Sequence, residues 1–125
     1  MQLIVKRDEI TADLPYGELR IGKENGYTPL ELLIASIAGC SAIVFRTILE
    51  KKRITYHEFT METEIKRSET VSKPVESAHL HYKIKAEGIT QEQLEKALEL
   101  AMKNCTIVQS VKGSIEIIET IELIS

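Results

Sequence analysis

The sequence lacks an excess of charge of either sign. Its 125 residues include 16 basic and 19 acidic side chains, which gives a formal net charge of -3 at pH 7. Proteins that bind nucleic acid or anionic membranes through electrostatics usually carry a strongly basic patch or stripe. The composition therefore gives no support to a nucleic-acid partner or to a membrane partner.

Cysteine is scarce, and the amino terminus shows none of the features of an export signal. Residues 1–10, MQLIVKRDEI, contain no long apolar segment and no small-residue cleavage site. The two cysteines, Cys40 and Cys105, are too few for a disulfide framework. We therefore expect a cytoplasmic location, where any disulfide between them would be transient or catalytic.

The sequence also has no internal repeat, low-complexity segment, glycine-rich phosphate loop or nucleophile elbow. Its length predicts a single domain over residues 1–125. Neither a cofactor nor a metal ion is expected. His79 and His81 have the spacing to share a metal ion in principle, but a solvated strand face is the favoured interpretation.

One long apolar segment, residues 28–52, stands at the centre of the chain. Thr28, Pro29 and Glu31 predict a helix start, with a capping threonine, proline at the first position and a capping-box glutamate. Residues 32–45 carry no charge, yet this run is shorter than the roughly 20 residues that cross a bilayer. A helix that is apolar on nearly every side must be covered on nearly every side, which favours a dimer.

Alternating patterns predict strands on both sides of this helix. Short strands are expected at residues 2–6 and 18–22, with a turn at residues 14–17 between them. Residues 55–65 alternate, with His57 and Phe59 expected on the same face. Residues 75–86 alternate as well, and the two runs predict an antiparallel pair.

A second helix and a last strand complete the predicted order. Thr90 and Gln93 form a capping box, and the apolar stripe that follows continues as far as Cys105. Asn104 is expected to break the helix so that a new turn begins near Cys105. Residues 114–124 predict the last strand. The order of elements indicates an α+β fold instead of a regular βαβ alternation.

Both cysteines lie on elements that should face the core. From their spacing alone, the favoured interpretation is that each is a small buried hydrophobic side chain. The alternative is a redox pair, in which one thiolate attacks a peroxide and the second thiol captures the resulting sulfenic acid. This chemistry needs a cation near the thiolate, and Arg20 is the candidate.

The chain resembles the OsmC/Ohr family of thiol-dependent peroxidases, and it looks closest to a shorter branch of that family. Three features carry the resemblance, which extends from about Leu19 to the carboxyl end. The central helix reads Pro-Leu-Glu-Leu-Leu from residue 29 and Ala-Gly-Cys-Ser-Ala-Ile from residue 38. A Lys73-Pro74 turn precedes a long alternating strand, and the second cysteine ends a helical segment at Asn104-Cys105.

The resemblance implies a fold, an activity and a set of site residues. The fold would be OsmC-like, with antiparallel sheets around a long buried helix in an intertwined homodimer whose active sites lie at the interface. Cys40 would be the reactive cysteine and Cys105 the resolving one. Arg20, nine residues before Pro29, holds the position of the family arginine. The substrate would be an organic hydroperoxide, the reductant an external dithiol, and the role antioxidant stress response.

Two positions depart from the family pattern. Leu30 stands where the family carries the glutamate that holds the arginine. The nearest acid, Glu31, points about 100° away around the helix, and its capping role is favoured over a catalytic one. Thr106 replaces a proline that commonly follows the second cysteine. Two alternatives therefore stay open: a non-enzymatic dimeric module that binds a small apolar or thiol-reactive ligand, and a dimer with both cysteines in its core.

Overall fold

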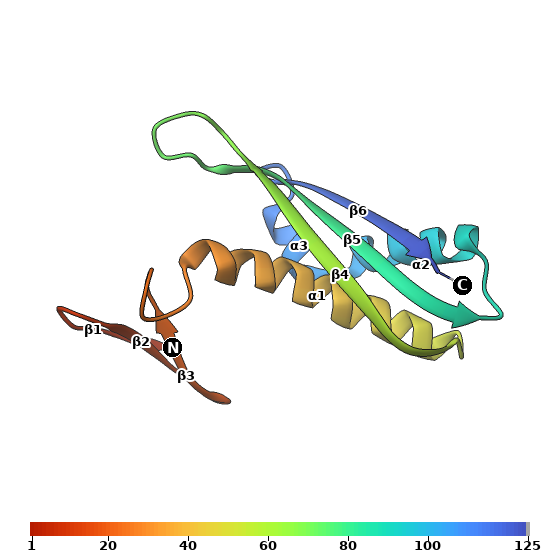
Figure 1. Cartoon of the computed structure of the whole chain (residues 1–125), viewed down its shortest axis with the longest axis horizontal. Helices are drawn as coiled ribbons and strands as arrows, with labels where there is room; N and C mark the ends of the chain where they lie inside the picture. The colour runs from red at the N-terminus through yellow and green to blue at the C-terminus, as the bar shows by residue number, and fades with distance from the viewer. Residues whose placement is uncertain (125) are drawn as a thin grey trace. The chain divides into compact units, whose positions relative to one another are not determined.

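The structure, a computed structural model, describes residues 1–124 (Figure 1). The chain divides into two compact units, Met1–Ala35 and Ser36–Ser125. Helix α1 (Pro29–Lys51) begins in the first unit and continues through the second. The predicted bounds of this helix are therefore confirmed to within one residue at each end.

The first unit is a small antiparallel sheet. Its strands are β1 (Gln2–Val5), β2 (Ile10–Leu14) and β3 (Gly17–Ile21), in the order β1-β2-β3. A tight turn joins the last two strands, where Leu14 pairs with Gly17. The outer strands and the turn agree with the predicted positions. The middle strand escaped the sequence pattern because it contains alanine and aspartate, which are uncommon in strands.

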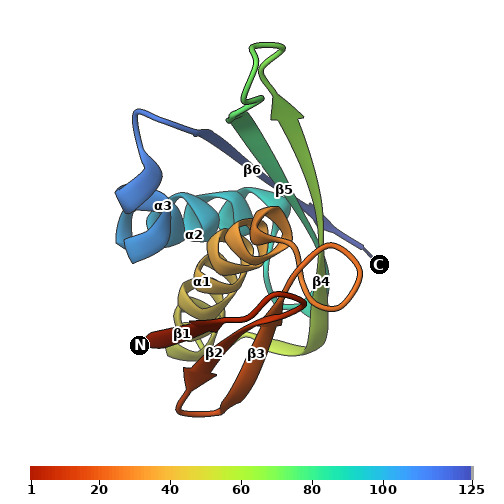
Figure 2. The ribbon, with the colours of Figure 1, turned by 90° about the vertical axis from the view of Figure 1, so that its left-hand side faces the viewer.

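The second unit packs helices against a three-stranded sheet. Strands β4 (Thr55–Arg67), β5 (Val75–Glu87) and β6 (Glu116–Leu123) lie in the order β4-β5-β6. Figure 2 shows the helices on one side of this sheet. The β4–β5 pair is antiparallel, as predicted. The β5–β6 pair is parallel, so the sheet is mixed and not purely antiparallel as the resemblance implied.

The parallel pair follows from the connection between the two strands. The chain leaves β5, forms α2 (Gln91–Asn104) and α3 (Thr106–Val111), and only then enters β6. A crossover of this length lets the chain return to the same end of the sheet. The α2 capping box is present: Thr90 Oγ1 accepts from the Gln93 amide, and the Gln93 side chain accepts from the Thr90 amide.

A bulge in β4 corrects one predicted side-chain orientation. The pairing of β4 with β5 shifts between Tyr56 and Phe59. Because an extra residue in one strand reverses the alternation beyond it, Tyr56 turns inward and His57 is exposed. The expectation that His57 shares a face with Phe59 was therefore wrong, whereas Phe59, Met61 and Ile65 keep the inward orientation.

Aromatic rings join α1 to the sheet. Phe45 on α1 and Tyr82 on β5 are fully buried, with ring centroids 5.1 Å apart in an edge-on arrangement. Phe59 on β4 lies 5.5 Å from Phe45 and 5.7 Å from Tyr82. Aromatic pairs at these separations contribute about 0.5–1.5 kcal/mol beyond the area that they bury. This cluster fixes the position of α1 on the sheet within the second unit.

Much of α1 remains uncovered by its own chain. Only 22% of its most apolar 18-residue window is buried. The full helix has 23 residues and is long and apolar enough to cross a membrane, whereas its uncharged run of residues 32–45 alone is too short. A single helix of this kind is weak evidence for a membrane span, because the core helix of a soluble protein meets the same criteria.

Candidate functional site

The start of α1 is fixed by a capping box. The Thr28 amide donates to Glu31 Oε1 at 2.9 Å, and the Glu31 amide donates to Thr28 Oγ1 at 3.1 Å. Hydrogen bonds from the backbone and side chain of Thr28 lower the pKa of Glu31. These contacts agree with the capping role favoured for Glu31, since they use the carboxylate at the helix start.

The junction between α2 and α3 positions Cys105. The residue is extended, with φ -85° and ψ 112°, and it serves as the end of one helix and the start of the next. Asn104 donates its side-chain amide to the Leu100 carbonyl at 2.9 Å, and the Gln109 amide donates to the Cys105 carbonyl at 3.0 Å. The predicted helix break near Cys105 is therefore present.

The structure brings the two cysteines together. Both are free thiols; Cys40 on α1 is partly exposed, whereas Cys105 is fully buried. Burial raises the pKa of the Cys105 thiol, and a side-chain hydrogen bond with Cys40 raises it further. The second unit thus contains one thiol with access to solvent and, near it, one buried thiol.

A line of polar side chains, from the fully buried Ser41 to the partly buried Glu119, continues from Cys105 into the second unit. The Ser41 hydroxyl, fully buried on α1, lies 3.7 Å from Cys105 Sγ and 3.1 Å from Glu119 Oε2. The Tyr82 hydroxyl on β5 donates to Glu119 Oε1 at 3.0 Å. The carboxylate of Glu119 on β6 is therefore held by two hydroxyl groups from two different elements.

Burial controls the acid–base properties of this line. Desolvation raises the pKa of Glu119, while the hydrogen bonds from Tyr82 and Ser41 act in the opposite direction. The pKa of Tyr82 is raised as well, chiefly by its burial and then by the charge of Glu119. Tyr82 therefore stays a neutral hydrogen-bond donor over the physiological pH range.

Sequence reasoning missed Ser41, Tyr82 and Glu119 as site residues. One signal was available for Glu119. The other residues on the same face of β6 are all apolar, namely Ile117, Ile121 and Leu123. A carboxylate on an apolar strand face indicates either a partner or a function. Its partners could not be read from the sequence, because they lie on α1 and β5.

Arg20 lies on β3 in the first unit, so its proposed relation to Cys40 in the second unit stays a prediction. Its guanidinium is 3.8 Å from Glu9 Oε2 and 3.7 Å from Glu18 Oε1, and its side chain is more than half exposed. Its carbonyl accepts from the Tyr27 amide at 2.9 Å. A β-carbon at Gly26 would lie 2.6 Å from the Arg20 backbone, so this loop requires glycine.

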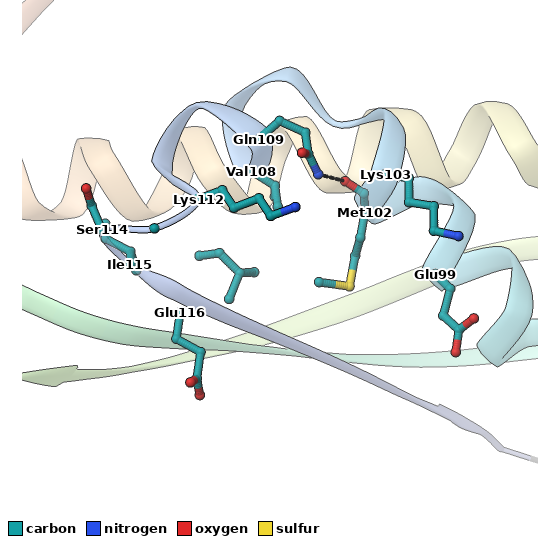
Figure 3. Close-up of a pocket in the computed structure, with 11 residues that line it drawn as sticks. Glu99, Met102, Lys103, Val108, Gln109, Lys112, Ser114, Ile115 and Glu116 are labelled. Carbon is teal, nitrogen blue, oxygen red and sulfur yellow. Dashed lines mark hydrogen bonds between the residues drawn. The ribbon is translucent and has the colours of Figure 1, made fainter.

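An apolar groove of about 690 Å³ lies beside the thiols but contains neither cysteine (Figure 3). Met102, Val108, Ile115 and Ile117 form its apolar lining, and the charged side chains around it come from α2, β6 and Lys112, which follows α3. Figure 3 shows the Met102 side chain extending from α2 into this space, while the Met102 carbonyl accepts from Gln109 Nε2 at 3.0 Å. The groove has the size of a small-molecule site.

The two histidines considered for metal binding converge on a threonine. His79 Nε2 lies 2.7 Å from Thr120 Oγ1, and His81 Nδ1 lies 2.6 Å from the same oxygen. Across residues 1–124, no group of three or more histidine, cysteine, aspartate or glutamate side chains gathers as a metal site would require. The hydroxyl of Thr120 satisfies both rings on the exposed face of the sheet.

Comparison with known proteins assigns the family. Residues 22–120 match the family model described as OsmC-like protein. The chain therefore belongs to the OsmC-like family. Solved structures with a similar fold include an organic hydroperoxide resistance protein. No match was found among curated proteins.

Solved structures show the same fold at low sequence identity. A hypothetical protein from Aquifex aeolicus VF5 is 27% identical with a TM-score of 0.86, over 98% of this chain and 93% of that chain. An OsmC-like protein from Mycoplasma pneumoniae is 17% identical with a TM-score of 0.86, over 99% and 95%. An organic hydroperoxide resistance protein from Elizabethkingia anophelis is 16% identical with a TM-score of 0.77, over 98% and 94%. The predicted α+β, OsmC-like fold is confirmed.

Proposed function

We propose that the protein is a thiol-dependent peroxidase that reduces organic hydroperoxides. The observation that carries this proposal is the proximity of the Cys40 and Cys105 side chains, which interact with each other, in a chain of the OsmC-like family. A two-cysteine cycle needs one thiol that meets the peroxide and a second thiol within reach of the first. The partly exposed Cys40 and the buried Cys105 suit these two roles.

The proposed cycle has three steps. The Cys40 thiolate attacks one peroxide oxygen, the O–O bond breaks, and the alkoxide takes up a proton to leave as an alcohol. Cys105 then attacks the sulfur of the Cys40 sulfenic acid, and a disulfide forms as water leaves. A dithiol from solution reduces this disulfide to two thiols and becomes a disulfide itself. All electrons come from thiols, so the proposal includes no cofactor.

Arg20 is proposed to stabilise the Cys40 thiolate and the departing oxygen. A guanidinium is always charged and presents several donors in a fixed plane, which suits an oxygen that gains negative charge. The family glutamate is absent because Leu30 occupies its position. In this chain Glu9 and Glu18 are the carboxylates nearest Arg20, and they hold it at the surface of the first unit.

A homodimer and a reducing compartment are part of the proposal. Within the second unit, α1 exposes a stripe at helical spacing formed by Ser36, Gly39, Ile43 and Thr47. Ile43 is 57% exposed, and the space beside Gly39 would accept a β-carbon without contact. A second copy of the helix would cover Ile43 and the small side chains of this stripe. Recycling of the disulfide needs reduced dithiols, which fits the cytoplasm.

The test is consumption of cumene hydroperoxide with dithiothreitol as reductant. Wild type is expected to consume the peroxide, Cys40→Ser to lose this activity, and Cys105→Ser to accumulate a Cys40 sulfenic acid that a dimedone probe captures. Intact mass should show a loss of two hydrogens in wild type alone. Equal, slow consumption by wild type and Cys40→Ser would end the proposal.

A second candidate function is the binding of a small apolar ligand without chemistry. The groove bordered by α2, α3 and β6 favours it, because this volume and lining are typical of small-molecule sites. Titration with the fluorescent probe 1-anilinonaphthalene-8-sulfonate tests the idea. Binding should weaken in Met102→Glu and persist in Leu100→Glu, which changes an exposed side chain of α2 outside the groove. Equal binding by both variants would contradict it.

A further inference from the structure

Three polar side chains behind the cysteines have no part in the cycle described above. Ser41, Glu119 and Tyr82 come from α1, β6 and β5, and they form a continuous line of hydrogen bonds that ends at Cys105 Sγ. Apolar side chains of similar shape would fill this space without the cost of burying a carboxylate. The line therefore calls for an explanation in terms of chemistry.

The hydrogen bonds of Ser41 define two alternative states. Its hydroxyl has one hydrogen, yet it has two neighbours that can accept it, Cys105 Sγ and Glu119 Oε2. If the hydroxyl donates to the Glu119 carboxylate, its lone pair can accept from the Cys105 thiol. If it donates to a Cys105 thiolate, its lone pair can accept from a protonated Glu119. The two states differ by the transfer of one proton along the line.

We propose that Glu119 accepts the proton of Cys105, and that Ser41 passes it between them, when Cys105 attacks the sulfur of Cys40. The inference rests on the proposed function, because it takes Cys105 as the resolving thiol. Ser41 touches the reacting sulfur directly. Glu119 acts through Ser41, and Tyr82 orients the carboxylate by holding its other oxygen.

The proton transfer accompanies the formation of the disulfide. The Cys105 S–H bond breaks and its proton moves to the oxygen of Ser41, while the hydroxyl hydrogen of Ser41 moves to Glu119 Oε2. The thiolate of Cys105 forms a bond with the sulfur of Cys40, whose bond to its leaving group breaks. In the peroxidase cycle the leaving group is hydroxide. The proton held by Glu119 balances that hydroxide, so the net products are the disulfide and one water.

The environment of Cys105 explains why such a base is needed. Only the thiolate is nucleophilic, and burial raises the pKa of this thiol. Bulk water reaches the fully buried side chain poorly and cannot easily remove its proton. Burial also raises the pKa of Glu119, which makes this carboxylate a stronger base than an exposed one. Positioned bases of this kind contribute about 10²–10⁴-fold to proton-transfer steps.

The remaining groups around Glu119 give its proton a route to solvent. A cavity of about 260 Å³ between α2 and β6 is lined by Glu119 together with the exposed Glu95 and Glu99 of α2. From β5 the titratable neighbour is Tyr82, and from the helix junction it is Cys105, which Ser41 joins to Glu119. Among these residues there is no cation that would hold Glu119 permanently ionised.

The experiment uses Ellman's reagent, so that it does not depend on peroxide. Cys40 reacts first, releases one thionitrobenzoate and becomes a mixed disulfide. Cys105 then attacks this disulfide and releases the second thionitrobenzoate, a phase that Cys105→Ser should abolish. We expect Glu119→Gln to lower the ratio of the second to the first rate constant about 10-fold or more. The second phase in this variant should rise steeply between ~pH 6 and ~pH 9, because hydroxide must replace the carboxylate.

Two further variants separate a proton transfer from a structural role. Ser41→Ala should slow the second phase as Glu119→Gln does. The double variant should be no slower than either single variant, because both changes interrupt the same hydrogen-bonded path from Cys105 to Glu119. Glu122→Gln, an exposed carboxylate on the same strand, should match wild type. A second phase that is slowed equally at every pH, or unchanged in Glu119→Gln, would overturn the proposal.

The outcomes also separate this inference from the proposed function. If wild type consumes no peroxide but its second phase depends on Glu119, the peroxidase proposal fails and the proton transfer stands. If wild type consumes peroxide and Glu119→Gln keeps the wild-type pH profile, the peroxidase proposal stands and the proton transfer through Glu119 fails. Absence of any second phase in wild type would overturn both the pairing of the cysteines and the proton transfer.

Discussion

The hydroxyl oxygen of Ser41 lies 3.1 Å from a carboxylate oxygen of Glu119, although the two residues are 78 positions apart in the chain. The contact joins the central helix α1 to the last strand β6 in the interior of the second unit. A buried carboxylate is costly unless hydrogen bonds compensate its lost hydration. Glu119 receives two such bonds, and it is the group through which pH should affect both stability and chemistry.

The stability of the protein should depend on pH through Glu119. Because burial raises its pKa above the ordinary value of 4.5, the folded chain binds this proton more tightly than the unfolded chain. Its contribution to the free energy of unfolding is therefore present below about pH 4.5 and is lost as pH rises through the raised pKa. Glu119→Gln should reduce this loss of stability, measured by urea denaturation at acidic and neutral pH.

The matched control for this measurement is Glu122→Gln on the same strand. Its side chain is exposed, so the variant should keep the wild-type dependence of stability on pH. The hydrogen bonds from Tyr82 and Ser41 oppose the effect of burial on the pKa of Glu119. The test is therefore whether the free energy of unfolding falls or rises with pH. A wild-type curve that gains stability through the same pH range, with Glu119→Gln flatter, would contradict the assigned direction.

The aromatic cluster should dominate the packing energy between α1 and the sheet. Phe45→Ala would remove the ring that contacts both Phe59 and Tyr82, and would leave a cavity in a fully buried site. Truncations of this kind lower the free energy of unfolding by about 3–5 kcal/mol. Urea denaturation measures the change, with Val71→Ala in an exposed turn as control. A loss for Phe45→Ala no larger than that of the control would contradict the assigned packing.

Arg20 should affect the reaction of Cys40 with peroxide more than the stability of the fold. Its ion pairs with Glu9 and Glu18 are long and exposed, and such pairs contribute little to folding. If it stabilises charge at the reacting oxygen, Arg20→Met should lower the second-order rate constant with cumene hydroperoxide about 100-fold. Arg7→Met removes an exposed cation from the same unit and serves as control. Equal rates for the two variants would exclude Arg20 from the reaction.

The features that the sequence predicted well are local ones. The capping boxes at Thr28 and Thr90 depend on residues three positions apart, and both are present in the structure. The inward residues of β5 follow from simple alternation, and they are buried as expected. The apolar stripe of α2 predicted the burial of Cys105, and Asn104 beside it predicted the end of the helix. In each case the physical cause lies within a few residues of the pattern.

The features that escaped prediction are set by distant parts of the chain. The parallel pairing of β6 with β5 depends on where the α2–α3 connection returns to the sheet, which no local pattern records. The orientation of His57 depends on a bulge against β5. The partners of Glu119 could be predicted only by knowing both the register of β6 on β5 and which face of α1 packs against the sheet. Long-range pairing, not local propensity, therefore decides the composition of the site.

The exposed stripe of α1 should be the contact between two copies of the chain. The apolar side chain of Ile43 is 57% exposed on α1, and Gly39, one turn earlier, leaves room for a second backbone to approach. Wild type should therefore migrate in size-exclusion chromatography with light scattering as two chains of 14.1 kDa. Ile43→Glu should shift this mass to one chain, because burying a carboxylate at the contact is unfavourable.

Val71→Glu is the matched control for the dimer, because it adds the same charge at a fully exposed turn residue. It should keep the mass of two chains. Gly39→Leu should also dissociate the dimer, since a side chain at this position fills space that the second helix would occupy, whereas in the single chain a β-carbon there meets nothing within 4 Å. A dimer that survives both helix variants would place the contact on another surface, and a wild-type mass of one chain would rule out the dimer itself.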